Sequence, residues 1–399
     1  MSPIDVNREM LNPTSLQCLK KVYNSFTVKI VVRRQYQLTD NEKQLLTVLG
    51  RHPCISMKEL LNNTPYKQMS TVVKKVNQFK KQTIISGPVY AVDYGKLCVN
   101  TLRRLYCIVE LTQSYETVIE YLKLIEPLIW VYPVLSSYKE LVNVGFLSSD
   151  DAEVSALLQL LKDNNIIADY IVRARRDKRT IENPNFFGGP VPSLDNLLSS
   201  CELPTASFGE YDTEWNECDI RTLAYLYGGY EGIKLTEIQK KEKILHDRIW
   251  KYHQVRYSYE KMIKNKLIEK EYYIAPFPLD RCADFYLFLK TEDMHLTRRI
   301  LCNFARGGRL LKEYMLYDDW GTVGCVCHPL FVADLMHELD QVNEITEKEL
   351  YRVRSFSPGI FYAGEHAEFD YYNVETQRLE YPYSRYRRKI KERLEREDL

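Results

Sequence analysis

The chain repeats one order of predicted elements twice, with about 180 residues between equivalent positions. Each copy begins with three short helices and two extended pieces. A pattern of strand, helix, two strands, helix and strand follows. The first copy covers about residues 38–175 and the second about 214–356. The same weak order is improbable twice by chance, so the repeat supports both copies and indicates a chain built from two similar halves.

This pattern predicts an α+β fold with tandem winged helix-turn-helix domains, each followed by a ferredoxin-like (β-α-β-β-α-β) domain. Ferredoxin-like sheets have one face covered by helices, so we expect the open faces to be used for assembly. The predicted segments are an N-terminal extension (1–37), winged helix-turn-helix 1 (38–100), ferredoxin-like domain 1 (101–175), a linker (176–213), winged helix-turn-helix 2 (214–278), ferredoxin-like domain 2 (279–358) and a C-terminal tail (359–399).

The first helix-turn-helix carries start signals for its helices. Leu38-Thr39-Asp40-Asn41-Glu42 offers a capped helix start, and Ser56-Met57-Lys58-Glu59 is a capping box. A third helix is predicted from about Tyr66 to Lys81, with apolar residues at helical spacing. The extended pieces Ile84-Ile85 and Val89 to Val92 are joined by Ser86-Gly87-Pro88, which predicts a small hairpin as the wing.

The third helix holds the strongest functional signal, because residues 66–81 contain five lysines and no acidic residue. Exposed helix faces usually mix the two charges, since opposite charges one turn apart stabilise a helix. In a major groove, amides and hydroxyls can read base edges while lysines neutralise phosphates. The predicted DNA contacts of this helix are Lys67, Gln68, Ser70, Thr71, Lys74, Lys75, Gln78 and Lys81.

The second copy departs further from the pattern. An apparent insertion from Lys240 to Trp250 precedes the predicted reader helix, Tyr252 to Lys266. The second wing is predicted from Leu267-Ile268 and Tyr272 to Ala275. Its predicted DNA contacts are His253, Gln254, Arg256, Tyr257, Lys261 and Lys264. The alternative for this copy is a purely structural partner of the first.

Each copy resembles the leucine-responsive regulator (Lrp/AsnC) family. The resemblance is carried by Ser70-Thr71-Val72-Val73-Lys74-Lys75-Val76-Asn77-Gln78-Phe79 and continues from Thr83-Ile84-Ile85 to Val92-Asp93-Tyr94-Gly95-Lys96-Leu97. It implies double-stranded DNA as partner, with Ser70, Lys74 and Lys75 at the DNA surface. It also implies that the two sheets pack within one chain as a pseudo-dimer; a homo-oligomer is the alternative. Thr83 stands where the family usually has Gly before the wing.

The resemblance further implies a small-molecule effector, which the family binds near a Gly and Asp before its third sensing strand. This chain has Ser137-Tyr138-Lys139-Glu140 in the first copy and Asp318-Asp319-Trp320-Gly321 in the second. Neither segment matches that pattern, so no ligand-binding residue is predicted. Assembly alone is the alternative role for these domains.

Two other functions are compatible with this architecture, an enzyme and a scaffold. Siroheme decarboxylases share this architecture, and such an enzyme would need cationic or imidazole groups facing the tetrapyrrole carboxylates. Ferredoxin-like domain 2 has His295, His328 and His337, whereas domain 1 has no histidine. A scaffold that does not bind DNA is the other rival. Neither rival needs the acid-free lysine face, so we predict a DNA-binding transcription regulator with no catalytic step and no cofactor.

Composition restricts the location and the electrostatics. The ten cysteines form no C-x-x-C pair, and Cys325-Val326-Cys327-His328 has no metal-site spacing, so no metal is predicted. The longest apolar stretch, Leu128 to Leu135, is far shorter than the roughly 20 residues of a membrane helix. With no secretion signal at Met1, we expect a cytoplasmic protein without membrane contact.

The net charge is +1, but the charges are unevenly distributed. Residues 66–81 hold five lysines, and residues 240–270 hold ten basic and four acidic groups. The rest of the chain is therefore acidic.

Overall fold

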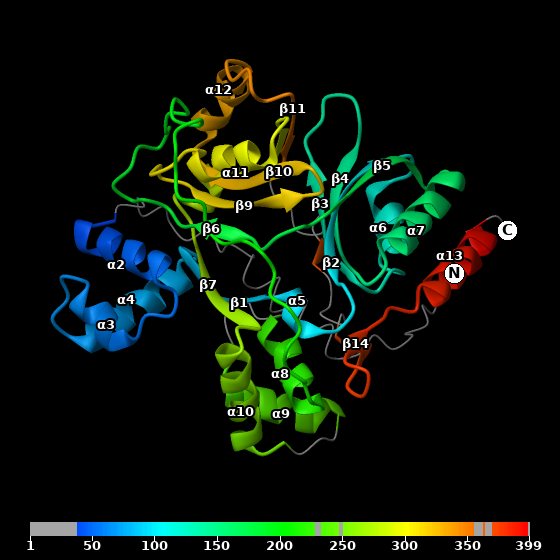
Figure 1. The fold of residues 1–399 in the computed structure, drawn as a ribbon, viewed down its shortest axis with the longest axis horizontal. Coiled ribbons are helices and arrows are strands. Elements are labelled where there is room, and N and C mark those ends of the chain that lie inside the picture. The colour runs from blue at the N-terminus through cyan, green and yellow to red at the C-terminus, as the bar shows by residue number, and fades with distance from the viewer. Residues whose placement is uncertain (1–37, 228–232, 247–249, 355–361, 364–368, 398–399) are drawn as a thin grey trace, which may run out of the picture.

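The computed structural model describes residues 38–227, 233–246, 250–354, 362–363 and 369–397. The predicted N-terminal extension, 1–37, lies outside these residues. Over the described residues the chain is an α+β protein with two helix-turn-helix units and two five-stranded sheets, as the sequence pattern predicts (Figure 1). Among the described helices, none is long and apolar enough to cross a membrane.

The first helix-turn-helix forms as its start signals predict. Its helices are α2 (Asp40–Arg51), α3 (Met57–Asn62) and α4 (Met69–Lys81). Both capping boxes are present, with Thr39 and Glu42 at α2 and with Ser56 and Glu59 at α3. The third helix begins later than predicted, because Gln68 has an extended backbone (φ −130°, ψ 130°) and serves as the N-cap of α4.

The second helix-turn-helix differs from its prediction in its middle helix. Its helices are α8 (Glu217–Tyr227), α9 (Leu235–His246) and α10 (Tyr252–Lys264). The residues from Lys240 onward, predicted as an insertion, continue α9 by almost two turns. The buried carboxylate of Glu242 anchors this extension, since it accepts hydrogen bonds from Arg221, Tyr225 and Trp250.

The predicted wings are not separate hairpins. Strand β1 (Ile85–Val92) is continuous and pairs antiparallel with β7 (Ile268–Ile274), so that each copy supplies one strand of a shared ribbon. The register shifts between Ser86 and Val89, and Gly87 lies at this bulge with a φ of +116°, which favours glycine. The hairpin prediction was wrong because the edge groups of β1 find their partners in the other copy.

Each copy contains one ferredoxin-like sheet with two helices on its outer face (Figure 1). Sheet 1 has the order β12-β3-β4-β2-β5, and sheet 2 has the order β11-β8-β10-β9-β6. The elements of domain 1 are β2 (Arg103–Leu111), α6 (Tyr115–Leu122), β3 (Leu128–Val134), β4 (Leu141–Ser148), α7 (Asp151–Asp163) and β5 (Ile167–Ala174). Those of domain 2 are β8 (Ala283–Lys290), α11 (Met294–Asn303), β9 (Leu311–Tyr317), β10 (Trp320–Cys327), α12 (Pro329–Asp340) and β11 (Glu347–Arg352).

The two copies exchange their edge strands. Strand β6 (Thr180–Glu182) follows domain 1 in sequence but pairs with β9 of sheet 2. Strand β12 (Tyr362–Ala363) follows domain 2 and pairs with β3 of sheet 1. Isolated bridges occur at equivalent points, between Arg175 and Tyr317 and between Val134 and Val353. The exchange relates the halves by an approximate twofold symmetry and ties each sheet to the chain of the other.

The open faces of the two sheets pack against each other. Along β8, Phe285, Leu287 and Leu289 face the helices of domain 2, whereas Phe288 lies in a separate cluster between the sheets. Tyr106 of β2 meets this cluster from sheet 1, with its ring centroid 4.8 Å from that of Phe288. The two sheets therefore meet within one chain, the arrangement expected for a pseudo-dimer.

The segment between the copies packs into three different hydrophobic cores. Phe186 enters the core of the first helix-turn-helix, Leu194 and Leu197 enter that of domain 2, and Trp215 enters the core shared by domain 1 and the second helix-turn-helix. The C-terminal region adds the pair β13 (Tyr372–Asn373) and β14 (Arg378–Leu379) and helix α13 (Tyr383–Glu397). Short helices α5 (Tyr94–Leu97) and η1 (Leu279–Arg281) lead into the two sheets.

We predict that Phe288→Ala lowers the free energy of unfolding by about 3–5 kcal/mol, because it removes a fully buried ring from the inter-sheet cluster. The exposed Leu330→Ala, in the same domain, should change it by less than about 0.5 kcal/mol. Urea denaturation of the full chain measures both. If the two substitutions lowered the free energy of unfolding equally, the inter-sheet contact would not be a main source of stability.

Candidate nucleic-acid interface

Helix α4 presents most of its predicted contacts to solvent. Lys74, Gln78 and Lys81 are exposed along the helix, and Ser70 is exposed in its first turn. Lys67 and Gln68 are exposed as well, but they precede the helix rather than belonging to it. Thr71 is half-buried. Positions 70, 74, 78 and 81 follow helical spacing, so these side chains share one face.

Lys75 is an exception, because it has a packing partner. Its Nζ lies 2.8 Å from Oε1 of Glu42, which also accepts the backbone N–H of Thr39 at the start of α2. Burial alone would raise the pKa of the Glu42 carboxyl. The hydrogen bonds from Lys75 and Thr39 outweigh burial and leave that pKa lowered. Lys75 therefore holds α4 against α2, which does not fit its predicted place at the DNA surface.

The exposed face of helix α10 carries less net positive charge than that of α4. His253, Arg256, Tyr257 and Lys264 are exposed, but Arg256 is bound to Glu260 one turn along, with 2.8 Å between Nε and Oε1. Gln254 accepts the backbone N–H of Lys251 at 2.9 Å and so closes the helix start. The groove beside α10 is also lined by Glu217 and Glu260, which reduce its positive potential.

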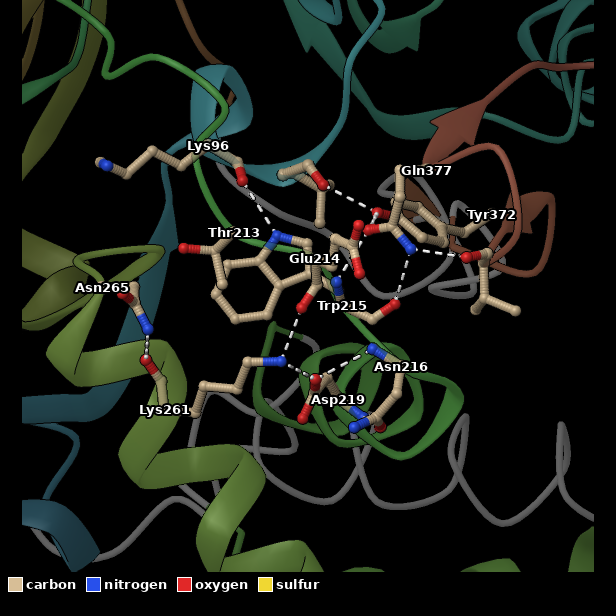
Figure 2. A network of polar contacts seen from close by, with 12 residues as sticks. Lys96, Thr213, Glu214, Trp215, Asn216, Asp219, Lys261, Asn265, Tyr372 and Gln377 are labelled. Carbon is tan, nitrogen blue, oxygen red and sulfur yellow. Dashed lines mark hydrogen bonds and ion pairs between the residues drawn. The ribbon is translucent and has the colours of Figure 1, made fainter.

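Lys261 of α10, predicted as a DNA contact, forms an internal network with the start of α8 (Figure 2). Its Nζ donates to the backbone carbonyl of Glu214 at 2.6 Å and to Oδ2 of Asp219 at 2.7 Å. The side chain of Asp219 is 1% exposed and that of Lys261 is 19% exposed. The ammonium also lies 4.9 Å from the Trp215 ring centroid. Lys261 therefore joins α10 to the start of α8.

The C-terminal region extends this network (Figure 2). The side-chain amide of Gln377 bonds both backbone groups of Trp215, accepting from its N–H at 2.7 Å and donating to its carbonyl at 2.9 Å. Tyr372 donates to the same amide oxygen at 2.9 Å. The indole of Trp215 donates to the carbonyl of Lys96. The start of the second helix-turn-helix is thereby fixed to the C-terminal region and to α5, through residues that are not among the predicted contacts.

The histidines weighed for an enzymatic site do not converge. His295 lies exposed in the first turn of α11, and His337 lies exposed near the end of α12. His328 caps α12, where its Nδ1 accepts the backbone N–H of Leu330 at 3.3 Å. Within the described ranges, no three His, Cys, Asp or Glu side chains gather as a metal site.

The two segments at the position of the family's effector site differ in the burial of their aromatic residue. Tyr138 is exposed in the connection between β3 and β4. Trp320 packs within the inter-sheet cluster, with its ring centroid 4.4 Å from the guanidinium carbon of Arg173.

Comparisons with known proteins give distant structural matches. No family model matches the sequence, and no curated protein matches it. The siroheme decarboxylase NirDL is 8% identical with a TM-score of 0.44, over 90% of this chain and 100% of that chain. AsnC from E. coli is 16% identical with a TM-score of 0.25, over 35% of this chain and 92% of that chain. A transcriptional regulatory protein of the AsnC family from Pyrococcus furiosus is 15% identical with a TM-score of 0.24, over 35% and 89%.

We predict that Lys261→Met destabilises the protein by about 3–5 kcal/mol, because Asp219 would stay buried without its cation. Lys264 lies three residues further along α10 and is exposed, so Lys264→Met should change stability by no more than about 0.5 kcal/mol. Chemical denaturation of the two variants compares them directly. If Lys261→Met were as mild as Lys264→Met, Lys261 would be a surface residue after all.

Proposed function

We propose that this chain is a transcription regulator that binds double-stranded DNA through α4 and performs no catalytic step. The observation that carries the proposal is the exposed face of α4. Lys74 and Lys81 flank Gln78 on this face, and no acidic residue occurs from 66 to 81. An amide between two cations suits a major groove, where bases offer donors and acceptors and phosphates line both edges.

Helix α10 supplies a secondary contact in this proposal. Its exposed Lys264 and His253 suit phosphate neutralisation, but the ion pair between Arg256 and Glu260 leaves little net charge near the centre of the helix. The β1–β7 ribbon joins the two helix-turn-helix units, so both would approach one duplex as parts of a single body. The two copies are thus unequal, with α4 as the main reader.

The enzymatic alternative gains no support from the site geometry. A tetrapyrrole decarboxylase needs acid–base groups that reach one substrate together. His295 and His337 are instead exposed on the outer helices of domain 2, and His328 is used as a helix cap. A scaffold function would give the exposed charges of Lys74 and Lys81 no role.

Separate substitution of the two neighbouring lysines tests the proposal. Lys74→Ala should weaken DNA binding and reduce the slope of log affinity against log salt by about 0.9, because one phosphate contact is lost. Lys75→Ala should leave that slope unchanged, because its ammonium is paired with Glu42. Fluorescence anisotropy with duplexes selected from genomic fragments, at roughly 50–200 mM salt, measures both slopes.

Two outcomes would count against the proposal. An unchanged slope for Lys74→Ala would remove α4 from the DNA interface. A saturable change in the absorption spectrum of added siroheme, without selection of any duplex, would favour the enzymatic alternative.

A further inference from the structure

Two arginines lie together where both sheets and the second helix-turn-helix meet. Arg104 is near the start of β2, and its carbonyl accepts the backbone N–H of Arg175 at 2.9 Å. Arg175 follows β5 and forms the bridge to Tyr317 at the end of β9. Tyr227, the last residue of α8, receives a hydrogen bond from Arg104 at 2.6 Å. This junction therefore contacts three of the four domains.

Both guanidinium groups are incompletely satisfied. Arg175 is 6% exposed, and its Nε is buried with no hydrogen-bond partner. The Nε of Arg104 is also buried and unpartnered, although its NH2 group reaches the hydroxyls of Tyr227 and Tyr94. A buried polar group without a partner costs free energy, and a buried charge costs more. These hydroxyls are neutral, so they do not balance the two positive charges.

The remaining walls of this site are aromatic. The guanidinium carbon of Arg175 lies 5.8 Å from the ring centroid of Tyr94 and 5.1 Å from that of Phe208. The guanidinium carbon of Arg104 lies 6.0 Å from the Tyr94 centroid and 5.5 Å from that of Trp130. Both cations thus share one ring. Stacking on aromatic faces stabilises a cation, but it offsets only part of the cost of removing two like charges from water.

Other buried cations nearby form ion pairs with carboxylates. Arg173 forms two hydrogen bonds to the Glu349 carboxylate, at 2.9 and 3.0 Å. Arg179 pairs with Glu313 and Glu271, and Lys312 pairs with Glu182. Arg104 and Arg175 have no ion pair with any carboxylate of the described chain. Burial, followed by the charge of Arg104, lowers the pKa of the Arg175 guanidinium. At Arg104, burial is outweighed by the hydroxyls of Tyr227 and Tyr94, which raise the pKa of that guanidinium. Of the two cations, Arg175 is the one that its surroundings stabilise least.

We propose that Arg104 and Arg175 form a binding site for a small anion that carries a carboxylate or phosphate group. Arginine presents a planar fork of donors that matches either group with two parallel hydrogen bonds. The terminal nitrogens of Arg175 have no hydrogen-bond partner among the described residues and supply such donors, and the tyrosine hydroxyls around Arg104 supply further polar contacts. The aromatic rings beside both guanidinium groups lower the polarity of their surroundings, which strengthens the attraction between an anion and the arginines.

Anion titration of the full chain tests this site without any DNA. Inorganic phosphate and malonate are each added at constant ionic strength, with chloride as the balancing salt, while the thermal midpoint and the heat of binding are recorded. We expect a saturable rise of the midpoint with at least one of the two anions, because a ligand that binds only the folded state stabilises it. A response to one anion alone identifies whether the phosphate or the carboxylate is recognised.

Arg175→Met provides the decisive comparison, because it removes the charge and keeps an apolar stem. The variant should lose the saturable response, and in chloride its midpoint should equal or exceed that of the unmodified chain, since an unpaired buried charge is gone. The exposed Arg306→Met is the matched control and should keep the response. If Arg175→Met does not fold, Arg175→Lys keeps the charge without the fork and should bind the anion at least tenfold more weakly.

The proposal is overturned if neither anion gives a saturable response in the unmodified chain. It is equally overturned if Arg175→Met responds like Arg306→Met, because the anion would then bind elsewhere. These results are independent of whether α4 binds DNA.

Discussion

The contact between the two sheets is the constraint on which the rest of this structure depends. A ferredoxin-like sheet covers one face with its own helices and leaves the other face in need of cover. Here Tyr106, Phe288 and Tyr317 meet in that space, with ring centroids 4.8–6.3 Å apart. Because both copies belong to one chain, this contact needs no second molecule. The exchanged strands β6 and β12 then hold each sheet to the other half.

That packing also determines where the helix-turn-helix units lie. The β1–β7 ribbon is the shared base of both units, and its two strands come from different copies. The first unit packs on Phe186, whereas the second shares a core with domain 1 and the C-terminal region. The helix-turn-helix units that contain α4 and α10 therefore pack against different parts of the chain.

Basic residues serve three different purposes in this chain. Lys74 and Lys81 are exposed on a helix without acidic neighbours, which is the arrangement that phosphate contact requires. Lys75 and Lys261 also belong to the third helices of the two units, yet each pairs with a carboxylate and holds two helices together. Arg104 and Arg175 are buried among aromatic rings with no carboxylate in the described part of the chain. Charge counting alone does not separate these groups.

The sequence by itself determined the order of the main elements, the α+β class and the starts of α2 and α3, because these depend on local signals. Thr39 with Glu42, and Ser56 with Glu59, act over three residues, and alternating apolar residues mark the strands. Only the tertiary structure decided the pairing of β1 with β7, the roles of Lys75 and Lys261, and the burial of Arg175. The physical reason is that their partners are distant in sequence. Lys75 finds Glu42 at a separation of 33 residues and Lys261 finds Asp219 at 42, while the edge of β1 is completed by a strand from the other half of the chain.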